Sequence, residues 1–385
     1  MMKTGMTLVL IALSVAPCYG EKQPRRVYPS ADELPEREYL PDPFKFFGTD
    51  RYVKDLKDWK ERQAQIKEML IHYLIGPPIP HYYDDQEVVQ VTTQEDSEHK
   101  VTLYDTHLRL GPPEKKMKYQ FRYYLPDSEK PVPIILRIHT TKELEKLEDT
   151  IEHFAPRGYG LAQLRTGKMP TDLHPEIEKN NQNRVAWTIS EVIHYLYKSH
   201  QIDKVILTGY SRWGKVTAAA GVLNERIDLT VPVVTGGIGV QTYANPNAFG
   251  SAHSIYVQSA GKYNRLPIDS HFIYAAMAPR AVLSIMGDEG DVKAQTFVEA
   301  YDAARIVYKW LGVEERVGLY DHSPRGPSCP WRWNARDNAP AIRGSAHEAP
   351  SANSRGRTAC RGGSLRTRPD NHCPDRFGSP RFHPS

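Results

Sequence analysis

The chain contains the heptapeptide Gly209-Tyr210-Ser211-Arg212-Trp213-Gly214-Lys215, which follows an apolar run at 205–208 and precedes small residues at 216–221. A strand, a sharp turn and a small-residue helix in this order present a serine as a nucleophile. The hydroxyl attacks a carbonyl when it projects from a strained turn, with a helix N-terminus beneath it to stabilise the developing negative charge. Glycines flank such a serine because side chains would clash with the turn. The heptapeptide therefore predicts that Ser211 is a catalytic nucleophile.

Strand and helix patterns alternate along most of the chain. Helical spacing of apolar residues predicts a helix over 55–75, which a Gly-Pro-Pro sequence stops. Alternating stretches at 100–110 and 117–125 predict an antiparallel hairpin. Apolar runs then alternate with helical patterns such as 185–199 and 294–310, which predicts a mostly parallel sheet with helices on both faces, in the order of the α/β-hydrolase fold. The strands of this sheet are expected at 134–139, 160–164, 205–208, 229–234, 281–286 and 317–320.

The segment around the serine resembles the signature Gly-Cys-Ser-Arg-x-Gly-Lys of the glucuronoyl esterase family of carbohydrate esterases, with Tyr210 in place of the cysteine. The resemblance covers residues 40–326 approximately and implies a serine carboxylester hydrolase of the α/β-hydrolase superfamily. It also implies that Arg212 stabilises the oxyanion and that Lys215 binds sugar hydroxyls. Without the motif, Lys215 would be interpreted as a solvated helix lysine.

The carboxylate of the triad should lie at a strand end after Ser211, since this fold has the chain order serine, acid, histidine. Many glucuronoyl esterases carry a catalytic glutamate at the position of Val234, so the carboxylate must come from elsewhere here. The loop Asp288-Glu289-Gly290-Asp291, after the next strand, supplies three acids. We favour Asp291, with Asp288 as the alternative acid. For any single acid, capping of the following helix is an equally good interpretation.

The catalytic base should follow the last strand, in the sequence Tyr320-Asp321-His322-Ser323-Pro324-Arg325-Gly326. His322 is the candidate, although a histidine so close to a strand can also be held by local turn contacts. In the proteins that this chain resembles, the catalytic histidine more often follows a glycine a few residues later, where this chain has Pro327. We therefore expect the family's own base to be missing, with His322 as the best candidate that remains.

Three further segments resemble parts of the family. The stretches 266–271 and 278–280 correspond to segments that brace the strand carrying the acid. His271 precedes the acid in the chain, so it is interpreted as structural or substrate-lining. Trp187 is predicted to lie in the core rather than to form a carbohydrate platform. His139 begins the loop at the position of a second oxyanion donor, an assignment by position alone.

Composition excludes several classes of partner. The formal net charge is +4, but residues 327–385 carry ten Arg, no Lys and four acidic residues, so the remainder is close to neutral and predicts no nucleic-acid surface. Three of the four cysteines lie in that same tail, so no disulfide framework is expected in the main domain. The main domain shows no metal-ligand spacing and no phosphate loop, so we expect no metal and no cofactor.

The N-terminal 20 residues combine Lys3, an apolar run at 6–16 and small residues before a charged stretch, which predicts a secretory signal. The run is too short to span a bilayer and no later run is longer, so no membrane association is expected. Cys18 would suit a lipoprotein anchor, but Pro17 is a poor fit to such processing. The expected location is secreted or periplasmic.

The C-terminal residues 327–385 contain Pro and Gly throughout and no apolar periodicity. Such a segment cannot bury enough apolar surface to fold. One interpretation is a disordered basic tail that binds polyanions; we favour a change of reading frame just after Gly326. The predicted domains are thus a signal peptide at 1–20, an α/β-hydrolase domain at 21–326 and this tail.

The predicted function is a secreted serine carboxylester hydrolase, expected to be a monomer, that acts on esters of a polysaccharide or oligosaccharide. The resemblance makes a 4-O-methyl-glucuronoyl methylesterase the first choice. The alternatives are a polysaccharide acetyl esterase and a catalytically inactive relative that binds carbohydrate.

Overall fold

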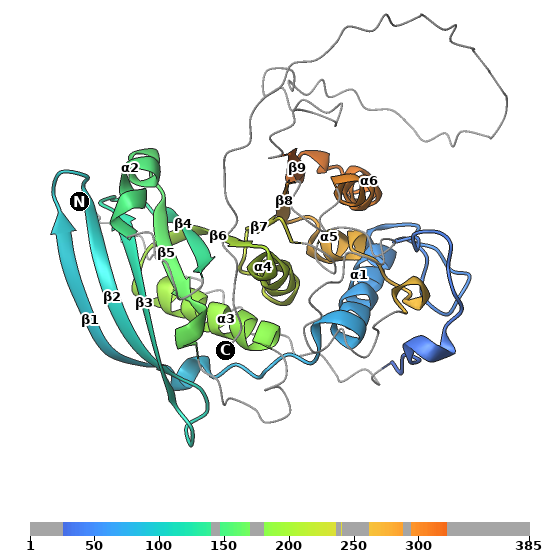
Figure 1. The fold of residues 1–385 in the computed structure, drawn as a ribbon, viewed down its shortest axis with the longest axis horizontal. Helices are drawn as coiled ribbons and strands as arrows, with labels where there is room; N and C mark the ends of the chain where they lie inside the picture. The colour runs from blue at the N-terminus through green and yellow to red at the C-terminus, as the bar shows by residue number, and fades with distance from the viewer. Residues whose placement is uncertain are drawn as a thin grey trace, which may run out of the picture. The chain divides into compact units, whose positions relative to one another are not determined.

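The computed structural model of the chain describes residues 26–139, 147–169, 181–235, 240, 262–287 and 294–321. All of them belong to one compact unit. Their strands form a nine-stranded sheet in the order β1-β2-β3-β5-β4-β6-β7-β8-β9 (Figure 1). Neighbouring strands pair antiparallel from β1 to β5 and parallel from β5 to β9. The predicted antiparallel start and parallel continuation are both present.

The strands agree closely with the predicted positions. The strand expected at 281–286 coincides with β8, and the one expected at 205–208 is the centre of a nine-residue strand, β6. The full set is β1 (Glu87–Asp96), β2 (Val101–Leu110), β3 (Met117–Pro126), β4 (Val132–His139), β5 (Gly160–Arg165), β6 (Ile202–Tyr210), β7 (Leu229–Val233), β8 (Ala281–Met286) and β9 (Val317–Asp321).

Six α-helices lie within the described ranges: α1 (Leu56–Leu70), α2 (Ile151–Phe154), α3 (Asn181–Ser199), α4 (Arg212–Leu223), α5 (His271–Met277) and α6 (Ala294–Trp310). Helix α1 begins at the N-cap Asp55, whose carboxylate accepts the Asp58 N–H at 2.9 Å. A turn of π-helix, Ile71–Ile75, extends it to Gly76, which ends it with a φ of 84°. The predicted helix at 55–75 is therefore confirmed.

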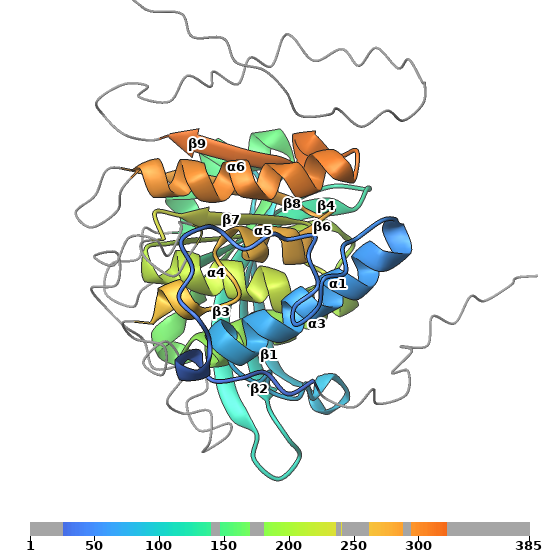
Figure 2. The ribbon, with the colours of Figure 1, turned by 90° about the vertical axis from the view of Figure 1, so that its right-hand side faces the viewer.

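Helices cover both faces of the sheet. Ile134 and Leu136 of β4 are buried together with Val185 of α3 in a core that continues under α4. Ile135, which points to the opposite face, packs with Ile151 of α2. A second core joins α1, α4, α5 and α6 on the same face of the sheet as α3. Helices α1 and α5 lie side by side on this face (Figure 2). The α/β-hydrolase fold predicted from the sequence is confirmed.

Strand β1 and helices α2 and α5 do not appear in the sequence prediction. Strand β1 pairs with β2 at the edge of the sheet, and nine of its ten residues are exposed. It carries neither an alternating nor a continuous apolar pattern because neither of its faces is buried. Helix α5 was missed for the opposite reason, since all seven of its residues are buried and it shows no polar face.

The residues before α1 are held against a distant part of the chain. The Arg37 guanidinium donates to the carbonyl oxygen of Leu266 at 2.7 Å and to the Asp269 carboxylate at 2.8 Å. Gln63 of α1 donates to the carbonyl of Ala275 in α5 at 3.0 Å. These contacts close the fold around the segment that leads into β8.

Candidate active site

The candidate nucleophile lies on a strained turn between β6 and α4. Ser211 has φ 53° and ψ −117°, a conformation that residues with a side chain rarely adopt. Its N–H donates to the carbonyl oxygen of Val233 at 2.8 Å, which anchors the turn to β7. Although Ser211 occupies the N-cap of α4, its hydroxyl caps no N–H of the described helix. The side chain is exposed, so the hydroxyl is free to face a substrate.

The glycines on either side of the serine are required by close backbone contacts. A Cβ on Gly209 would lie 2.7 Å from the carbonyl oxygen of Trp213 and 2.8 Å from Thr217 Oγ1. A Cβ on Gly214 would lie 2.8 Å from the carbonyl oxygen of Val233. The second glycine comes three residues after the serine because that is where the first turn of α4 passes β7. The predicted reason for both glycines is confirmed.

The start of α4 offers donors to a developing oxyanion. The N–H groups of Gly214 and Lys215 donate to the Ser211 carbonyl at 3.0 and 3.4 Å. The N–H groups of Arg212 and Trp213 form no hydrogen bond with any described residue, as expected for the first turn of a helix. Arg212 is exposed beside the serine, so its N–H and its guanidinium are both available to a negatively charged oxygen.

Lys215 is buried one turn into α4, with 9% of its surface exposed. The interpretation as a solvated surface lysine is therefore wrong. Burial, and to a smaller extent the positive charge of Arg212, lowers the pKa of Lys215 from the ordinary 10.5 to about 8. No carboxylate of the described residues forms an ion pair with it, in contrast to exposed Lys204, which pairs with Asp228. A buried ammonium of this kind is a strong donor for a hydroxyl that approaches it.

The remaining members of the predicted triad lie outside the described residues. Asp288, Asp291 and His322 therefore have no described geometry. The last described residue before the two acids is Gly287, and the last before His322 is Asp321. The strands that precede them end at the same edge of the sheet as the elbow. The carboxyl ends of β6, β7, β8 and β9 are neighbours in register, and adjacent strands are about 4.8 Å apart. The loop after β8 thus starts about 10 Å from the elbow and the loop after β9 about 14 Å from it.

The segments predicted to brace the strand carrying the acid form hydrogen bonds with other parts of the fold. Asp269 is fully buried, pairs with Arg37 and accepts the Ser270 N–H at 2.7 Å. Arg280 donates to the carbonyl oxygens of Gly221 at 2.6 Å and Ile227 at 2.8 Å, and so fixes the end of α4. The pairing with Arg37 has no signal in the sequence, because an exposed-looking arginine some 230 residues away carries no pattern that points to it.

Two aromatic or histidine side chains singled out by the sequence are structural. His271 is fully buried on α5 and contacts the carbonyl oxygen of Pro41 through Nε2 at 2.8 Å. Trp187 is 3% exposed and donates its indole N–H to the carbonyl oxygen of Pro80 at 2.8 Å. The prediction that Trp187 lies in the core is confirmed. His139 ends β4, and the loop that follows it at 140–146 lies outside the described residues.

The family of the chain follows from a comparison with known proteins. The family model described as "Glucuronyl esterase, fungi" matches residues 112–312, which is just over half of the chain. The chain belongs to the glucuronoyl esterase family. The match spans the strands β3 to β8 and the whole elbow, so the resemblance predicted from the heptapeptide is confirmed.

Curated glucuronoyl esterases resemble the chain over most of its length. The 4-O-methyl-glucuronoyl methylesterase 1 of Wolfiporia cocos is 24% identical, covering 82% of this chain and 84% of that protein. The multidomain esterase of Ruminococcus flavefaciens is 24% identical over 77% of this chain, which spans only 44% of that longer protein.

Solved glucuronoyl esterase structures share the fold. A promiscuous esterase of carbohydrate esterase family 15 from a marine bacterial metagenome superposes with a TM-score of 0.62 at 20% identity, covering 76% of this chain and 94% of that one. A serine-to-alanine variant from Sporotrichum thermophile, in complex with methyl 4-O-methyl-β-D-glucopyranuronate, gives 0.58 at 17% identity, covering 77% and 85%. These likenesses confirm the architecture.

At the position where the family resemblance places a catalytic glutamate, this glucuronoyl esterase has Val234, which carries no carboxylate. Val234 has a φ of 44°, which is strained for a β-branched residue, and is 4% exposed. Its N–H donates to the carbonyl oxygen of Ile285 at 2.7 Å, which holds the end of β7 against β8. Tyr210, which replaces the cysteine of the signature, is 50% exposed next to the nucleophile.

Proposed function

We propose that this chain is a serine carboxylester hydrolase that cleaves esters of glucuronate attached to a polysaccharide or oligosaccharide. The observation that carries the proposal is the conformation of Ser211 above the N-terminus of α4, on the heptapeptide that matches the family signature. The class of reaction follows from membership of the glucuronoyl esterase family. The 4-O-methyl-glucuronoyl ester is the preferred substrate because relatives with that name resemble the chain.

The reaction has two steps. The Ser211 oxygen attacks the ester carbonyl, its proton passes to the base, and the oxyanion is stabilised by Arg212 and the first N–H groups of α4. Collapse of the tetrahedral intermediate breaks the bond to the alcohol, which leaves with the proton from the base. Water then attacks the acyl-enzyme and releases the glucuronate. We assign the base to His322, held by Asp291 or alternatively by Asp288.

Lys215 supplies substrate recognition in this scheme. Its buried ammonium lies one turn beyond Ser211 on α4 and has no carboxylate partner among the described residues. A sugar hydroxyl that accepts a hydrogen bond from it would orient the carbonyl carbon over the serine. Binding should therefore weaken as pH rises through about 8, where Lys215 loses its proton.

The experiment that tests the proposal compares two esters with purified full-length chain. Methyl glucuronate ester should be hydrolysed, an aryl acetate should not, and Ser211→Ala should abolish the activity. Preferential cleavage of the acetate, still dependent on Ser211, would instead select the acetyl esterase. Binding of an oligosaccharide without any Ser211-dependent turnover would select the inactive relative.

The location and the assembly of the protein are also proposals. The pattern at residues 1–20 supports export to the cell exterior or the periplasm. Within the described ranges, every helix is too short or too polar to cross a membrane. We propose a monomer, which size-exclusion chromatography with light scattering tests directly.

A further inference from the structure

A cavity of about 500 Å³ lies between α1 and the loop that precedes it. Phe47 and Pro267 give it apolar walls, whereas Asp42, Lys45 and Thr49 line it with polar groups. Arg62 of α1 also lines it. The residues of the elbow are absent from this lining, so the cavity is a different place from the candidate active site.

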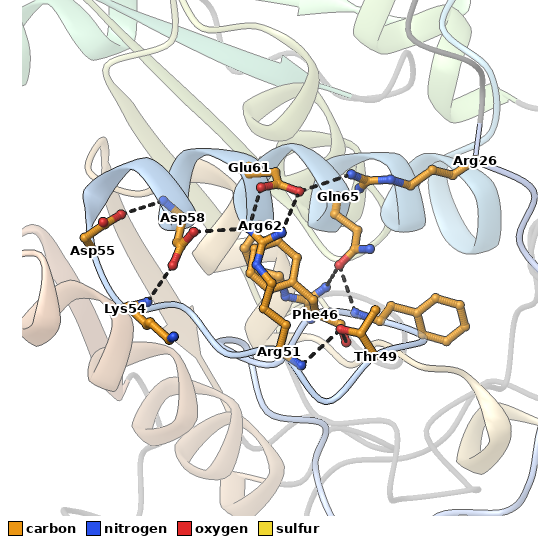
Figure 3. Close-up of polar contacts among 11 residues, drawn as sticks. Arg26, Phe46, Thr49, Arg51, Lys54, Asp55, Asp58, Glu61, Arg62 and Gln65 are labelled. Atoms are coloured by element: carbon orange, nitrogen blue, oxygen red, sulfur yellow. Dashed lines mark hydrogen bonds and ion pairs between the residues drawn. The ribbon is translucent and has the colours of Figure 1, made fainter.

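The loop that forms the cavity is a hairpin closed by backbone hydrogen bonds. The Phe46 N–H donates to the carbonyl oxygen of Arg51 at 2.9 Å, and the Val53 N–H donates to that of Phe44 at 2.9 Å. The Arg51 guanidinium lies 3.8 Å from the centre of the Phe46 ring and pairs with Asp58 and Glu61 on α1, as Figure 3 shows. The cavity is thus formed before any ligand arrives.

Arg62 is a buried cation that has no carboxylate partner among the described residues. It is 2% exposed, and its guanidinium donates to Gln65 Oε1 at 2.5 Å (Figure 3). It also donates to the carbonyl oxygen of Pro43 at 3.0 Å and makes a long contact with the Asp42 carbonyl at 3.5 Å. All of these acceptors are neutral. Asp42 is the acid whose charge acts on it most, yet within the described ranges no carboxylate forms an ion pair with Arg62.

Two partly buried arginines elsewhere in the fold have their charge balanced. Arg37 pairs with the Asp269 carboxylate at 2.8 Å. Arg280 donates to carbonyls at the C-terminal end of α4, where the helix dipole is negative. Arg62 lies in the middle of α1 and receives neither kind of compensation. Burial lowers the pKa of Arg62 to about 10, so it is charged at neutral pH. The face of the Phe272 ring, with its centroid 5.3 Å from the guanidinium carbon, and the charge of Asp42 offset this charge in part, but no carboxylate of the described residues pairs with it beside the cavity.

We propose that this cavity binds a uronic acid residue, whose carboxylate pairs with the Arg62 guanidinium. A guanidinium presents N–H groups in a planar fork that matches a carboxylate, and such charge-assisted pairs are strong. The mixture of apolar walls and a polar rim fits a hydroxylated sugar ring, which has hydrophobic faces and a polar edge. The chain would then hold an acidic polysaccharide at a second point, apart from the serine.

Isothermal titration of the full-length chain with sodium glucuronate tests the proposal, with glucose as the neutral sugar and benzoate as the apolar acid. Glucuronate should bind more tightly than either. Arg62→Lys, which keeps the charge but loses the fork, should weaken the Arg62-dependent binding about 10-fold, and Arg62→Gln should remove it. Arg26→Gln is the matched control and should change nothing, because Arg26 is an exposed arginine that pairs with Glu61 and Glu68 of α1 and does not line the cavity.

Thr49→Trp keeps the test decisive if the Arg62 variants are unstable. Thr49 is exposed and lines the cavity, so an indole at this position should block it without touching the guanidinium. Both kinds of variant should hydrolyse a small methyl ester as fast as the original chain. Glucuronate binding with the same affinity and stoichiometry in Arg62→Gln and Thr49→Trp as in the original chain, or tighter binding of benzoate or glucose than of glucuronate, overturns the proposal. Absence of any glucuronate binding does so too.

Discussion

The elbow after β6 and the loops after β8 and β9 were both assigned catalytic roles, but on different grounds. At the elbow, each residue type is imposed by its neighbours: Gly209 and Gly214 by backbone contacts below 3 Å, and Ser211 by a turn anchored to Val233. In the two loops, Asp291 and His322 were chosen by chain order and strand position alone.

The difference shows which kind of sequence-based assignment predicts contacts that a structure can test. A motif whose residues touch one another across a turn can be tested against distances, and here it agrees with them. When a residue is chosen only because it follows a strand, the strand fixes its approximate position. Its contacts are not predicted. The predictions below probe these two kinds of assignment.

Replacement of the nucleophile should have the largest effect. Ser211→Ala removes the attacking oxygen and should lower kcat on methyl glucuronate ester by about 10⁴-fold or more. The thermal unfolding midpoint should hardly change, because the Ser211 hydroxyl makes no cap within the described helix. Steady-state kinetics and a melting curve measure both. Residual activity within a factor of ten of the original would transfer the nucleophile's role to another residue.

Substitution of Asp291 and Asp288 tests which acid of the loop after β8 belongs to the triad. Asp291→Asn should lower kcat about 10³-fold or more, because an amide does not stabilise a protonated histidine as a carboxylate does. Asp288→Asn, the matched variant on the same loop, should lower it by less than about 10-fold. The reverse order would make Asp288 the triad acid. Equal and small effects would place the carboxylate on a different loop.

Lys215→Met separates recognition from stability. Below about pH 8 the folded chain must keep a buried charge, which the unfolded chain, with a pKa near 10.5, holds in water. Between these values the unfolded state binds more protons, so the destabilising contribution of Lys215 disappears as pH rises. Lys215→Met should therefore raise the free energy of unfolding by roughly 2 to 3 kcal/mol at pH 7 and by little at pH 10.

The same variant should raise KM for the glucuronate ester. Urea denaturation at both pH values and kinetics at pH 7 are the measurements. Lys204→Met is the control, since that side chain is 55% exposed and should change stability by no more than about 0.5 kcal/mol. A Lys215→Met chain that is less stable at pH 7 and has the same KM would contradict both the burial argument and the binding role.

Gly209→Ala should have the smallest effect of these variants. The new Cβ would meet the carbonyl oxygen of Trp213 at 2.7 Å, and backbone cannot move aside cheaply, so we expect a loss of about 1 to 3 kcal/mol. Gly318→Ala on β9 is matched to it, because its nearest neighbour is the end of the Leu283 side chain at 3.0 Å and should give way. Equal losses for the two variants would show that the elbow is less tightly packed than its distances indicate.

Most of the fold could be predicted because most of its elements have one buried face or a continuous apolar core. The period of β4, with alternate residues buried, is visible in the letters of the sequence. Strand β1 was invisible because a strand exposed on both faces has no apolar period to detect. Helix α5 is buried on every side, so its seven residues resemble an apolar strand as much as a helix.

The candidate site was predictable in part. The run of small residues after Lys215 already indicated a helix packed on all sides, a signal that the lysine itself would be buried. Arg62 offered a similar clue, since it falls at helical spacing with Trp59, Ile66 and Met69 on the buried face of α1. The lack of a carboxylate beside Arg62, however, depends on which distant segments meet there, and no local pattern records that.

The anchoring of Arg37 has a consequence for biosynthesis. Its distant hydrogen-bond partners, from Tyr263 to Asp269, lie 226 to 232 residues further along the chain. At a synthesis rate of about 5–20 residues per second, the N-terminal segment leaves the ribosome roughly 10 to 50 seconds before the residues that it must bind. During that interval its aromatic side chains have no core to join. The nascent enzyme should therefore depend on chaperones until the segment leading into β8 has been made.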